Sequence, residues 1–285
     1  MKSEKIIGWW SGGITSAVAC NLGIELYGKE NVRIIFIDTM NEDLDTYRFM
    51  ADCEKWYGIE IEIIKSEKFN SIEDVWIKYK ALNNAAGAVC SSTLKRDVRE
   101  KWQKDNEWKH QIFGFDLKES KRAIGMTLNH PKVKAIYPLM MYGLHKKDCI
   151  NIVQEAGLKI PKAYEMGYLN NNCLGKHFGC VQGGIGYWQK IKIDNPKAFE
   201  KRANLEHKLT KLKVKPVTML KDQSANGGLV FLKHNPEYPT IKDISMMKGR
   251  PPKPLVDCNG FCGTNDFEEK NETENELNWN QLKLF

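Results

Sequence analysis

The sequence contains no apolar run close to the ~20 residues that a membrane-spanning helix requires. Its opening residues also lack the apolar core and small-residue cleavage site of a secretory signal. A mean hydropathy of −0.50 with 42% hydrophobic residues argues against long disordered stretches. The 285 residues are enough for two domains, or for one large domain with an appendage. We therefore expect a cytoplasmic protein with no membrane partner.

Without an export signal, the eight cysteines are better candidates for metal ligation or catalysis than for disulfides. Cys20, Cys53 and Cys149 lie in apolar, helix-like stretches, where a thiol usually serves as a small buried apolar group. The remaining cysteines lie among Gly, Asn and Ser, and are Cys90, Cys173, Cys180, Cys258 and Cys262.

The formal net charge of +7 is unevenly distributed, because residues 268–285 hold five Glu and only two Lys. The excess of positive charge elsewhere suits a polyanionic ligand, either a nucleotide or a nucleic acid. Many proteins with such a balance bind no nucleic acid, so the charge alone is weak support for that class.

The first half alternates strand-like and helix-like segments. Apolar or β-branched runs at Lys5–Trp10, Val32–Ile37, Ile59–Ile64 and Gln111–Phe115 predict strands. Helical spacing lies between them, over Ile14–Tyr27, Asp43–Tyr57, Ile72–Leu82 and Ser91–Trp102. This order predicts an α/β fold with an open, mostly parallel, doubly wound sheet.

Ligands of such sheets bind beyond the carboxyl ends of the strands. The loops Ser11–Gly13, Asp38–Glu42 and Asp116–Glu119 all fall at that edge. Ser11–Ser16 reads Ser-Gly-Gly-Ile-Thr-Ser, between the first strand and the first helix. Two glycines let the backbone approach a phosphate, while hydroxyls and helix-start amides can donate to it. Neither a Walker loop nor a dinucleotide fingerprint is present, and a plain strand-to-helix turn is the alternative.

This segment resembles the SGGxDS-type loop of the PP-loop ATP pyrophosphatases, the adenine nucleotide α-hydrolase-like superfamily. Over roughly residues 5–210 the chain is similar to the phosphoadenosine phosphosulfate reductase-like branch of that superfamily. The supporting motifs, in chain order, are Phe36–Thr39 with Asn41 and Glu42, Gly87–Cys90 with Leu94–Arg96, Gly114–Asp116 with Glu119 and Arg122, Pro138–Leu139, Gly157–Pro161, Tyr164, and Asn172–Cys173 with Cys180–Gly184.

The resemblance implies that ATP with Mg²⁺, or a related adenine nucleotide, is cleaved between the α and β phosphates to adenylate an acceptor. The implied nucleotide site comprises Ser11, Gly12, Gly13, Ile14, Thr15, Ser16, Phe36, Asp38, Thr39 and Gly114. The implied catalytic residues are Lys95, Arg96, Asp116 and Arg122, of which the three cations would offset phosphate charge during transfer.

The sequence departs from the resembled pattern in two places. Thr15 replaces the usual Asp and Ile14 brings no Lys, so magnesium placement would fall to Asp38 or Asp116. The Glu-Cys-Gly-Leu-His motif of sulfonucleotide reductases is also missing. ATP-dependent adenylation is therefore favoured over sulfonucleotide reduction.

Two cysteine pairs, Cys173 with Cys180 and Cys258 with Cys262, lie on Gly- and Asn-rich segments that permit tight turns. By resemblance to sulfur-handling relatives, Cys90, Cys173, Cys180 and Cys262 hold a metal, with Cys258 as the alternative fourth ligand. An iron–sulfur cluster is favoured over zinc. The alternative is a set of reduced surface or packed thiols.

These patterns divide the chain into three parts. We expect a nucleotide-binding PP-loop α/β domain over 1–165, a Cys-containing, basic, mainly helical and loop C-terminal region over 166–265, and an acidic flexible tail over 266–285. The basic run 190–215 is either a solvated helix face or a surface that tracks phosphates.

The sequence thus predicts an adenylating enzyme that supports sulfur transfer, with a tRNA, DNA or small-molecule acceptor, a sulfur-donor protein and a homodimer as expected partners. A sulfonucleotide reductase and a non-catalytic nucleotide- or nucleic-acid-binding module with a structural metal are the alternatives.

Overall fold

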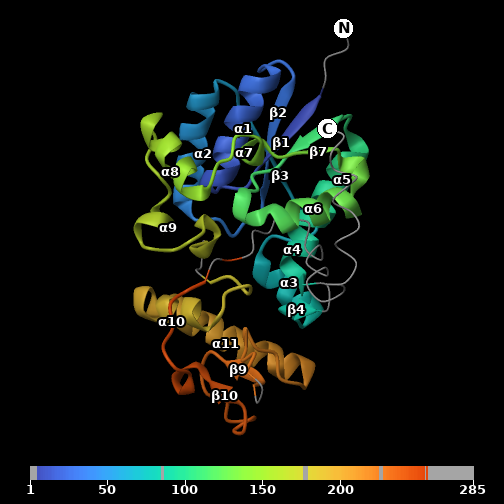
Figure 1. The fold of residues 1–285 in the computed structure, drawn as a ribbon. Coiled ribbons are helices and arrows are strands. Elements are labelled where there is room, and N and C mark those ends of the chain that lie inside the picture. Colours follow the sequence, from blue (N-terminus) through green and yellow to red (C-terminus); the bar gives the residue numbers. More distant parts are fainter. Residues whose placement is uncertain (1–4, 85–86, 176–178, 225–226, 254, 256–285) are drawn as a thin grey trace, which may run out of the picture.

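The computed structural model describes residues 5–84, 87–175, 179–224, 227–253 and 255. Its main feature is a parallel five-stranded sheet in the order β3-β2-β1-β6-β7 (Figure 1). The strands are β1 (Ile6–Trp10), β2 (Val32–Asp38), β3 (Ile61–Lys65), β6 (His110–Ile112) and β7 (Ala135–Ile136).

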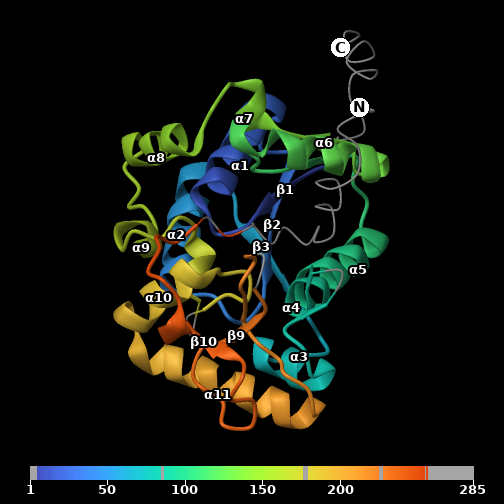
Figure 2. The ribbon, with the colours of Figure 1, turned by 60° about the horizontal axis from the view of Figure 1, so that its bottom comes forward.

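Helices cover both faces of this sheet (Figures 1 and 2). One face carries α1 (Ile14–Tyr27), α2 (Leu44–Tyr57) and α8 (Lys146–Glu155), and the other carries α5 (Asp97–Asp105) and α6 (Ser120–Asn129). The predicted doubly wound, parallel α/β fold is therefore confirmed.

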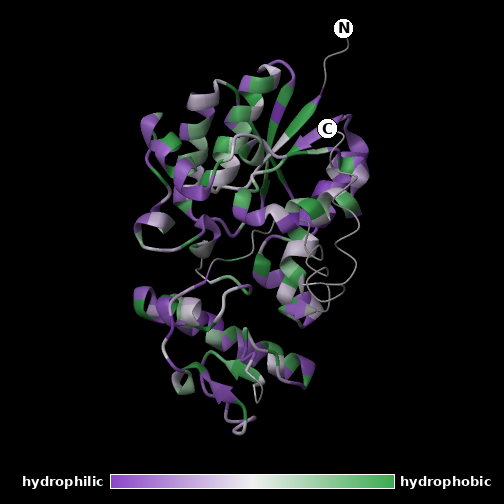
Figure 3. Cartoon of the chain, in the orientation of Figure 1, coloured by the Kyte–Doolittle hydropathy of each residue, from purple (hydrophilic) through white to green (hydrophobic). Residues whose placement is uncertain are grey.

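The central strand β1 shows why the sheet is buried on both faces. Ile6 and Trp10 belong to the core under α1 and α2, whereas Ile7 and Trp9 belong to the core under α5 and α6. Side chains alternate between the faces of a strand, so a strand covered on both sides must be apolar throughout. Figure 3 shows the same distribution, with hydrophobic residues concentrated on the sheet strands.

Strand β6 is shorter than its sequence pattern predicts. The apolar run Gln111–Phe115 suggests a longer strand, but β6 ends at Ile112. Gly114 then lies against the backbone of Thr15 and Ser16, so the chain packs here against the start of α1 instead of continuing the strand. Phe113 and Phe115 are apolar because they are buried, and a buried loop can be as apolar as a strand.

The C-terminal region contains α10 (Ile185–Asp194), α11 (Pro196–Lys213) and a small sheet in the order β10-β9-β8 (Figure 1). Its strands are β8 (Leu220–Lys221), β9 (Leu229–Phe231) and β10 (Lys242–Asp243). The other elements are α3 (Ile72–Tyr79), β4 (Asn83–Asn84), β5 (Gly87–Ala88), α4 (Val89–Ser91), the π-helix η1 (Ser92–Arg96), α7 (Pro138–Met141), α9 (Lys162–Glu165) and the 3-10 helices η2 (Leu117–Glu119), η3 (Pro131–Val133), η4 (Asn171–Cys173) and η5 (Ile244–Met246).

The C-terminal region shares a core with the segment between β3 and β6. Trp76 of α3 and Trp188 of α10 are buried in the same apolar cluster. Buried Arg202 of α11 pairs with Glu73 at 2.7 Å, and its guanidinium lies 4.9 Å from the centre of the Trp76 ring. Residues on both sides of the boundary predicted at residue 165 thus belong to one core, and the domain division stays a prediction. The tail 266–285 lies outside the described residues.

Cys20, Cys53 and Cys149 are buried, as predicted, and burial raises the pKa of Cys53 and Cys149 to about 12. They are apolar core groups in this fold. Along the described ranges, no helix is both long and apolar enough to cross a membrane.

Glu206 is a buried carboxyl on α11 whose oxygens accept hydrogen bonds from the amides of Met219 and, at 2.7 Å, Leu232. Burial raises its pKa to about 8, against the opposing effect of these two hydrogen bonds. Between about pH 5 and 8 the folded protein keeps a proton that the unfolded chain has lost, so rising pH lowers the free energy of unfolding.

We predict that Glu206→Gln removes this contribution, which has a slope of up to about 1.4 kcal/mol per pH unit. Denaturant unfolding at several pH values measures it. The test is the slope of the unfolding free energy against pH and not its absolute value, because Gln also alters a hydrogen bond and so shifts stability equally at every pH. Glu200→Gln, on the same helix but partly exposed, is the matched control. Identical slopes for the wild type and Glu206→Gln would contradict the assignment.

Candidate functional site

The glycine loop Ser11–Gly13 joins β1 to α1 at the carboxyl edge of the sheet. The Ser16 hydroxyl accepts hydrogen bonds from the Ser11 amide and hydroxyl, both at 3.0 Å, and donates to Gly13 O at 2.9 Å. These hydrogen bonds connect the start of the loop to the first turn of α1 and so fix the conformation of the loop. The first turn of α1 has no acidic residue and no side-chain cap, an arrangement that suits an anion.

Tyr164 covers the start of α1. The Ile14 amide donates to its hydroxyl at 3.3 Å, and a Cβ on Gly13 would lie 3.5 Å from the same oxygen. Lys146 Nζ lies 5.2 Å from the centre of the Tyr164 ring. A phosphate at this helix start would compete with the Tyr164 hydroxyl for the Ile14 amide.

Two glycines permit close contacts around the loop. Gly12 has φ +82°, and a Cβ there would lie 2.8 Å from Cγ2 of Thr46. A Cβ on Gly114 would lie 2.6 Å from both the amide nitrogen and Cα of Ser16. Gly114, a predicted nucleotide-binding residue, therefore packs directly against the backbone at the start of α1.

Three consecutive asparagines connect the loop to the C-terminal region. The Asn171 side-chain amide donates to Gly12 O at 2.8 Å and to the Thr46 hydroxyl at 3.0 Å. Asn170 accepts from the Leu255 amide at 2.9 Å, and Asn172 lines the pocket described below. One short segment thus contacts the glycine loop, α2 and the end of the described chain.

Polar side chains follow β2. The Asp38 carboxylate accepts from the Met40 amide at 2.6 Å and from the Tyr47 hydroxyl at 2.9 Å. Thr39 donates to Glu42 at 2.7 Å. Burial raises the pKa of Glu42, while the Lys95 charge and the Thr39 hydrogen bond oppose that rise. A buried carboxyl group and the charge of Lys95 therefore act on each other at this edge.

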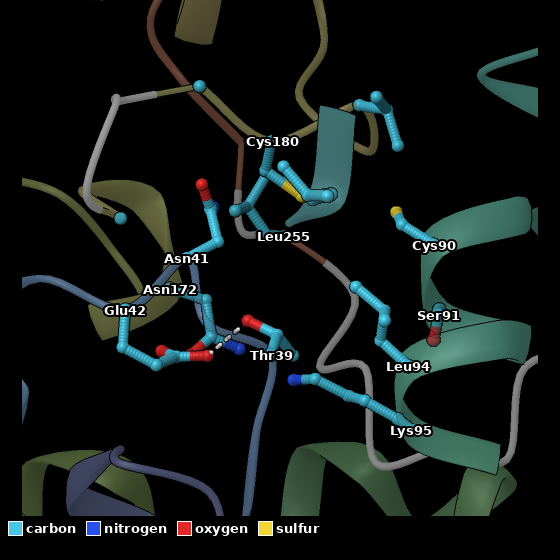
Figure 4. Close-up of a pocket in the computed structure, with 14 residues that line it drawn as sticks. Thr39, Asn41, Glu42, Cys90, Ser91, Leu94, Lys95, Asn172, Cys180 and Leu255 are labelled. Carbon is cyan, nitrogen blue, oxygen red and sulfur yellow. Dashed lines mark hydrogen bonds between the residues drawn. The ribbon is translucent and has the colours of Figure 1, made fainter. Parts of the chain in front are cut away.

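A partly open pocket, with about 620 Å³ of empty space when its open solvent side is included, lies beyond the end of β2 (Figure 4). Cys90 and Ser91 of α4, with Leu94 and Lys95 of η1, form one side in Figure 4. The remaining lining residues are Thr39, Asn41, Glu42, Ile72, Asn172, Gly175, Gly179, Cys180, Val181 and Leu255.

The pocket brings together two predicted metal ligands, Cys90 and Cys180, from distant parts of the sequence. Cys173 ends η4, directly after the lining residue Asn172, but its side chain is outside the described part. Cys258 and Cys262 lie outside the described residues as well. Among the described residues there is no group of three or more His, Cys, Asp or Glu side chains that could hold a metal ion. The four-cysteine site stays a prediction.

The predicted catalytic residues are in different surroundings. Lys95 lines the pocket, and the neighbouring Arg96 lies 3.8 Å from a carboxylate oxygen of Asp97. Asp116 accepts hydrogen bonds from the amides of Lys118 at 2.9 Å and Lys146 at 3.1 Å. Each oxygen of Asp116 and Asp38 thus accepts one of these hydrogen bonds, and its second lone pair could still bind a magnesium ion.

Arg122 pairs with Glu119, and its guanidinium lies 4.6 Å from the centre of the Phe115 ring. Phe36, predicted near the adenine, is buried and meets Trp10 edge to face at 5.3 Å. Only the Phe36 backbone can therefore face a ligand in this arrangement. Trp9 and Trp10 are both core residues.

The sequence did not identify Asn171 or Glu42 as site residues. The Asn-Glu pair after β2 and the run Asn170–Asn172 are visible as motifs. The hydrogen bonds of Asn171 join segments more than a hundred residues apart, whereas Glu42 bonds to Thr39 nearby and was missed because its burial depends on the fold.

The geometry agrees with a match to known proteins. The model of the phosphoadenosine phosphosulfate reductase domain matches residues 5–173. The chain belongs to this family. The match includes the glycine loop, Cys90, Lys95 and Asp116, and it confirms the resemblance given by the order of the motifs.

An uncharacterized protein of Methanocaldococcus jannaschii is 29% identical over 210 residues, which is 69% of this chain and 40% of that protein. The chain thus spans less than half of the length of this curated relative.

Two solved structures are similar at 17% identity each. Phosphoadenylyl-sulfate reductase from Candida auris has a TM-score of 0.45, covering 59% of this chain and 80% of its own. The NH3-dependent NAD synthetase from Campylobacter jejuni has a TM-score of 0.39, covering 74% of this chain and 86% of its own.

Gly114→Ala tests the packing behind the loop. Because the new Cβ would meet backbone atoms of Ser16, we predict a loss of about 1–3 kcal/mol in unfolding free energy and weaker ATP binding. Denaturant unfolding and calorimetric titration with ATP measure the two effects. Gly249→Ala is the control, since a Cβ there has no neighbour within 4 Å. A Gly114→Ala protein with wild-type stability and affinity would contradict this account.

Proposed function

We propose that this protein is an ATP-dependent adenylating enzyme of the ATP pyrophosphatase type, which activates an acceptor for sulfur transfer in nucleic-acid or small-molecule modification. The observation that carries the proposal is the glycine loop, with its closed hydroxyl bonds and its helix start without an acidic residue. Membership of the family supports an adenine nucleotide as the ligand of that loop.

In the proposed reaction, an oxygen of the acceptor attacks the α phosphorus of ATP. The bond from that phosphorus to the oxygen bridging it to the β phosphorus breaks, and pyrophosphate leaves with the electron pair. The acceptor now carries AMP as a leaving group, which a sulfur nucleophile from a donor can displace. Ser11–Ser16 would hold the phosphates, and Lys95 would offset charge on them from within the pocket. Arg96, Asp116 and Arg122 are proposed as catalytic residues only because of the family resemblance.

The cysteines support the sulfur-transfer part of the proposal. Cys90 and Cys180 line the same pocket as Lys95, so two thiols lie near the lysine that we propose offsets phosphate charge. Soft thiolate ligands suit an iron–sulfur cluster or zinc. Cys90, Cys173, Cys180 and Cys262, or Cys258 in its place, would hold the group. A cluster there would supply redox chemistry beside the activated acceptor.

A sulfonucleotide reductase is the second candidate, because the matching family model describes that domain. It would reduce the sulfonucleotide with electrons from a dithiol protein and release sulfite. The two candidates therefore differ in their products, which are pyrophosphate with AMP in one case and sulfite in the other.

Gly13→Ala tests the nucleotide site without a clash inside the protein, because the new Cβ would lie 3.5 Å from the Tyr164 hydroxyl and 3.8 Å from that of Ser11. We predict at least about a tenfold loss of pyrophosphate release from ATP with Mg²⁺ and bulk tRNA or DNA, since the methyl group occupies the approach of the phosphates.

Ser11→Ala should lower the same rate, while Gly228→Ala should retain it, since a Cβ there has no neighbour within 4 Å and Gly228 does not line the pocket. Pyrophosphate release that is unchanged in Gly13→Ala would exclude the proposed use of the loop. Sulfite release from phosphoadenosine phosphosulfate and reduced thioredoxin, without pyrophosphate release from ATP, would favour the reductase. ATP binding without turnover in either assay would favour a non-catalytic binding module.

Anaerobic purification tests the metal. We predict a brown protein with roughly four iron and matching sulfide per chain. Cys90→Ser and Cys180→Ser should each lose most of the iron, whereas Cys149→Ala, in the sheet core, should keep it. Absorption spectra with iron, zinc and sulfide analysis give the answer. One zinc per chain would favour the zinc alternative, and the absence of both metals would overturn the ligand assignment.

A further inference from the structure

An exposed basic segment outside the nucleotide site is residues 248–253, with the sequence Lys-Gly-Arg-Pro-Pro-Lys, here called the basic strap. It follows η5 and runs past α10 toward the sheet domain (Figure 2). Lys248, Arg250 and Lys253 are all exposed.

The backbone of the strap is fixed to α10. The Gln189 side-chain amide donates to Met247 O at 3.2 Å and to Lys248 O at 3.3 Å, and its oxygen accepts from the Arg250 amide at 3.1 Å. A Cβ on Gly186 would come within 2.5 Å of Arg250 O, so the strap lies directly on the helix. A defined backbone therefore presents the three cations.

Proline stiffens the same segment. Pro251 and Pro252 have restricted φ angles, and a following proline favours an extended conformation at Arg250. In an extended polyproline-type segment, residues three apart lie on one side, at a separation of about 9 Å. This pattern places Arg250 and Lys253 along one side of the strap with little entropy to lose on binding.

The strap carries little compensating negative charge. The sequence has no acidic residue between Asp243 and Asp257, and in the described part of the chain Lys248 and Lys253 form no ion pair. Asp222 is the acid near Arg250; hydrogen bonds from Ser224, then the charges of Lys242 and Arg250, lower its pKa.

The basic helix α11 differs in this respect. Lys201 pairs with Glu73 at 3.8 Å and Lys211 with Glu237 at 3.4 Å, so part of its charge is already matched within the protein. Lys197, Lys208 and Lys213 of this helix are also exposed, so what distinguishes the strap is its position next to the pocket.

The strap leads into the pocket. Two residues beyond Lys253, the Leu255 amide is bound to Asn170, and the Leu255 side chain lines the cavity that also contains Lys95 and Cys90. A chain of phosphates bound along the strap would thus be directed to the cavity at one end.

We propose that the basic strap binds the phosphates of a single-stranded nucleic acid and directs one nucleotide to the mouth of the pocket. A base paired within a duplex is not free to face the pocket, whereas an unpaired base is. The purpose of this binding rests on the proposed function, in which that nucleotide is the acceptor. Binding itself needs no ATP.

The test compares two triple variants of the full chain that lose the same charge. The strap variant is Lys248→Ala, Arg250→Ala and Lys253→Ala. The control variant is Lys29→Ala, Lys104→Ala and Lys132→Ala, at exposed positions that precede β2, β6 and β7 and so lie at the opposite edge of the sheet. Fluorescence anisotropy with a labelled 20-nucleotide oligouridine, without ATP, gives the dissociation constant over a range of salt concentrations.

We expect the strap variant to bind this probe at least about tenfold more weakly, and the slope of log K against log salt to fall by about 2, since each phosphate contact in a single strand contributes about 0.7. The control variant should bind within about twofold of the wild type.

Three results would overturn the inference: equal losses in both variants, no loss in the strap variant, or competition by polyglutamate as strong as that by unlabelled oligouridine. Calorimetric ATP binding in the strap variant separates the two proposals. Intact ATP binding with lost oligouridine binding supports the strap, whatever the outcome of the pyrophosphate assay.

Discussion

The buried side-chain amide of Asn171 connects the two halves of the candidate site. It donates to Gly12 O, in a residue with φ +82°, and to the hydroxyl of Thr46 on α2. Removing this amide would leave a buried carbonyl of the glycine loop without its donor, which costs about 1–3 kcal/mol. Its neighbours Asn170 and Asn172 contact Leu255 and the pocket. The conformation of the loop therefore depends on the docking of a segment 159 residues away.

That docking depends in turn on the core shared by the two parts of the chain. Trp76, Leu94 and Trp188 belong to one buried cluster, which fixes α3, α4 and η1 against α10. Because Cys90 belongs to α4 and Cys180 precedes α10, the same packing brings both thiols to one cavity. The π-helix η1 presents Lys95 from the side of the pocket that carries Cys90, and π-helical turns are common at functional sites.

The sequence predicted the parts of this structure that depend on local patterns. The apolar run of β1, the turn at Ser11–Gly13 and the alternation of strands with helices are all readable along the chain. It could not predict that the run Gln111–Phe115 leaves the sheet at Gly114, because a buried loop and a buried strand are equally apolar. Nor could it separate the ion-paired lysines of α11 from the exposed cations of the strap, since ion pairing depends on acids such as Glu73 and Glu237 from other elements.

The two departures in the glycine loop have a structural explanation. Ile14 and Thr15 are both buried, and Ile14 belongs to the core under α1 and α2. A Lys or Asp at these positions would have to be buried in their place or turn outward, and burial of a charge is costly. In the function proposed above, anion binding at this loop would then rely on backbone amides, the partly exposed Ser11 and cations supplied by other elements. Lys95 in the pocket and Lys146 beside Tyr164 are the candidates, and both come from outside the loop. Under that proposal, the charge near a bound phosphate would depend on the docking of η1 and α8 as well as on the loop sequence.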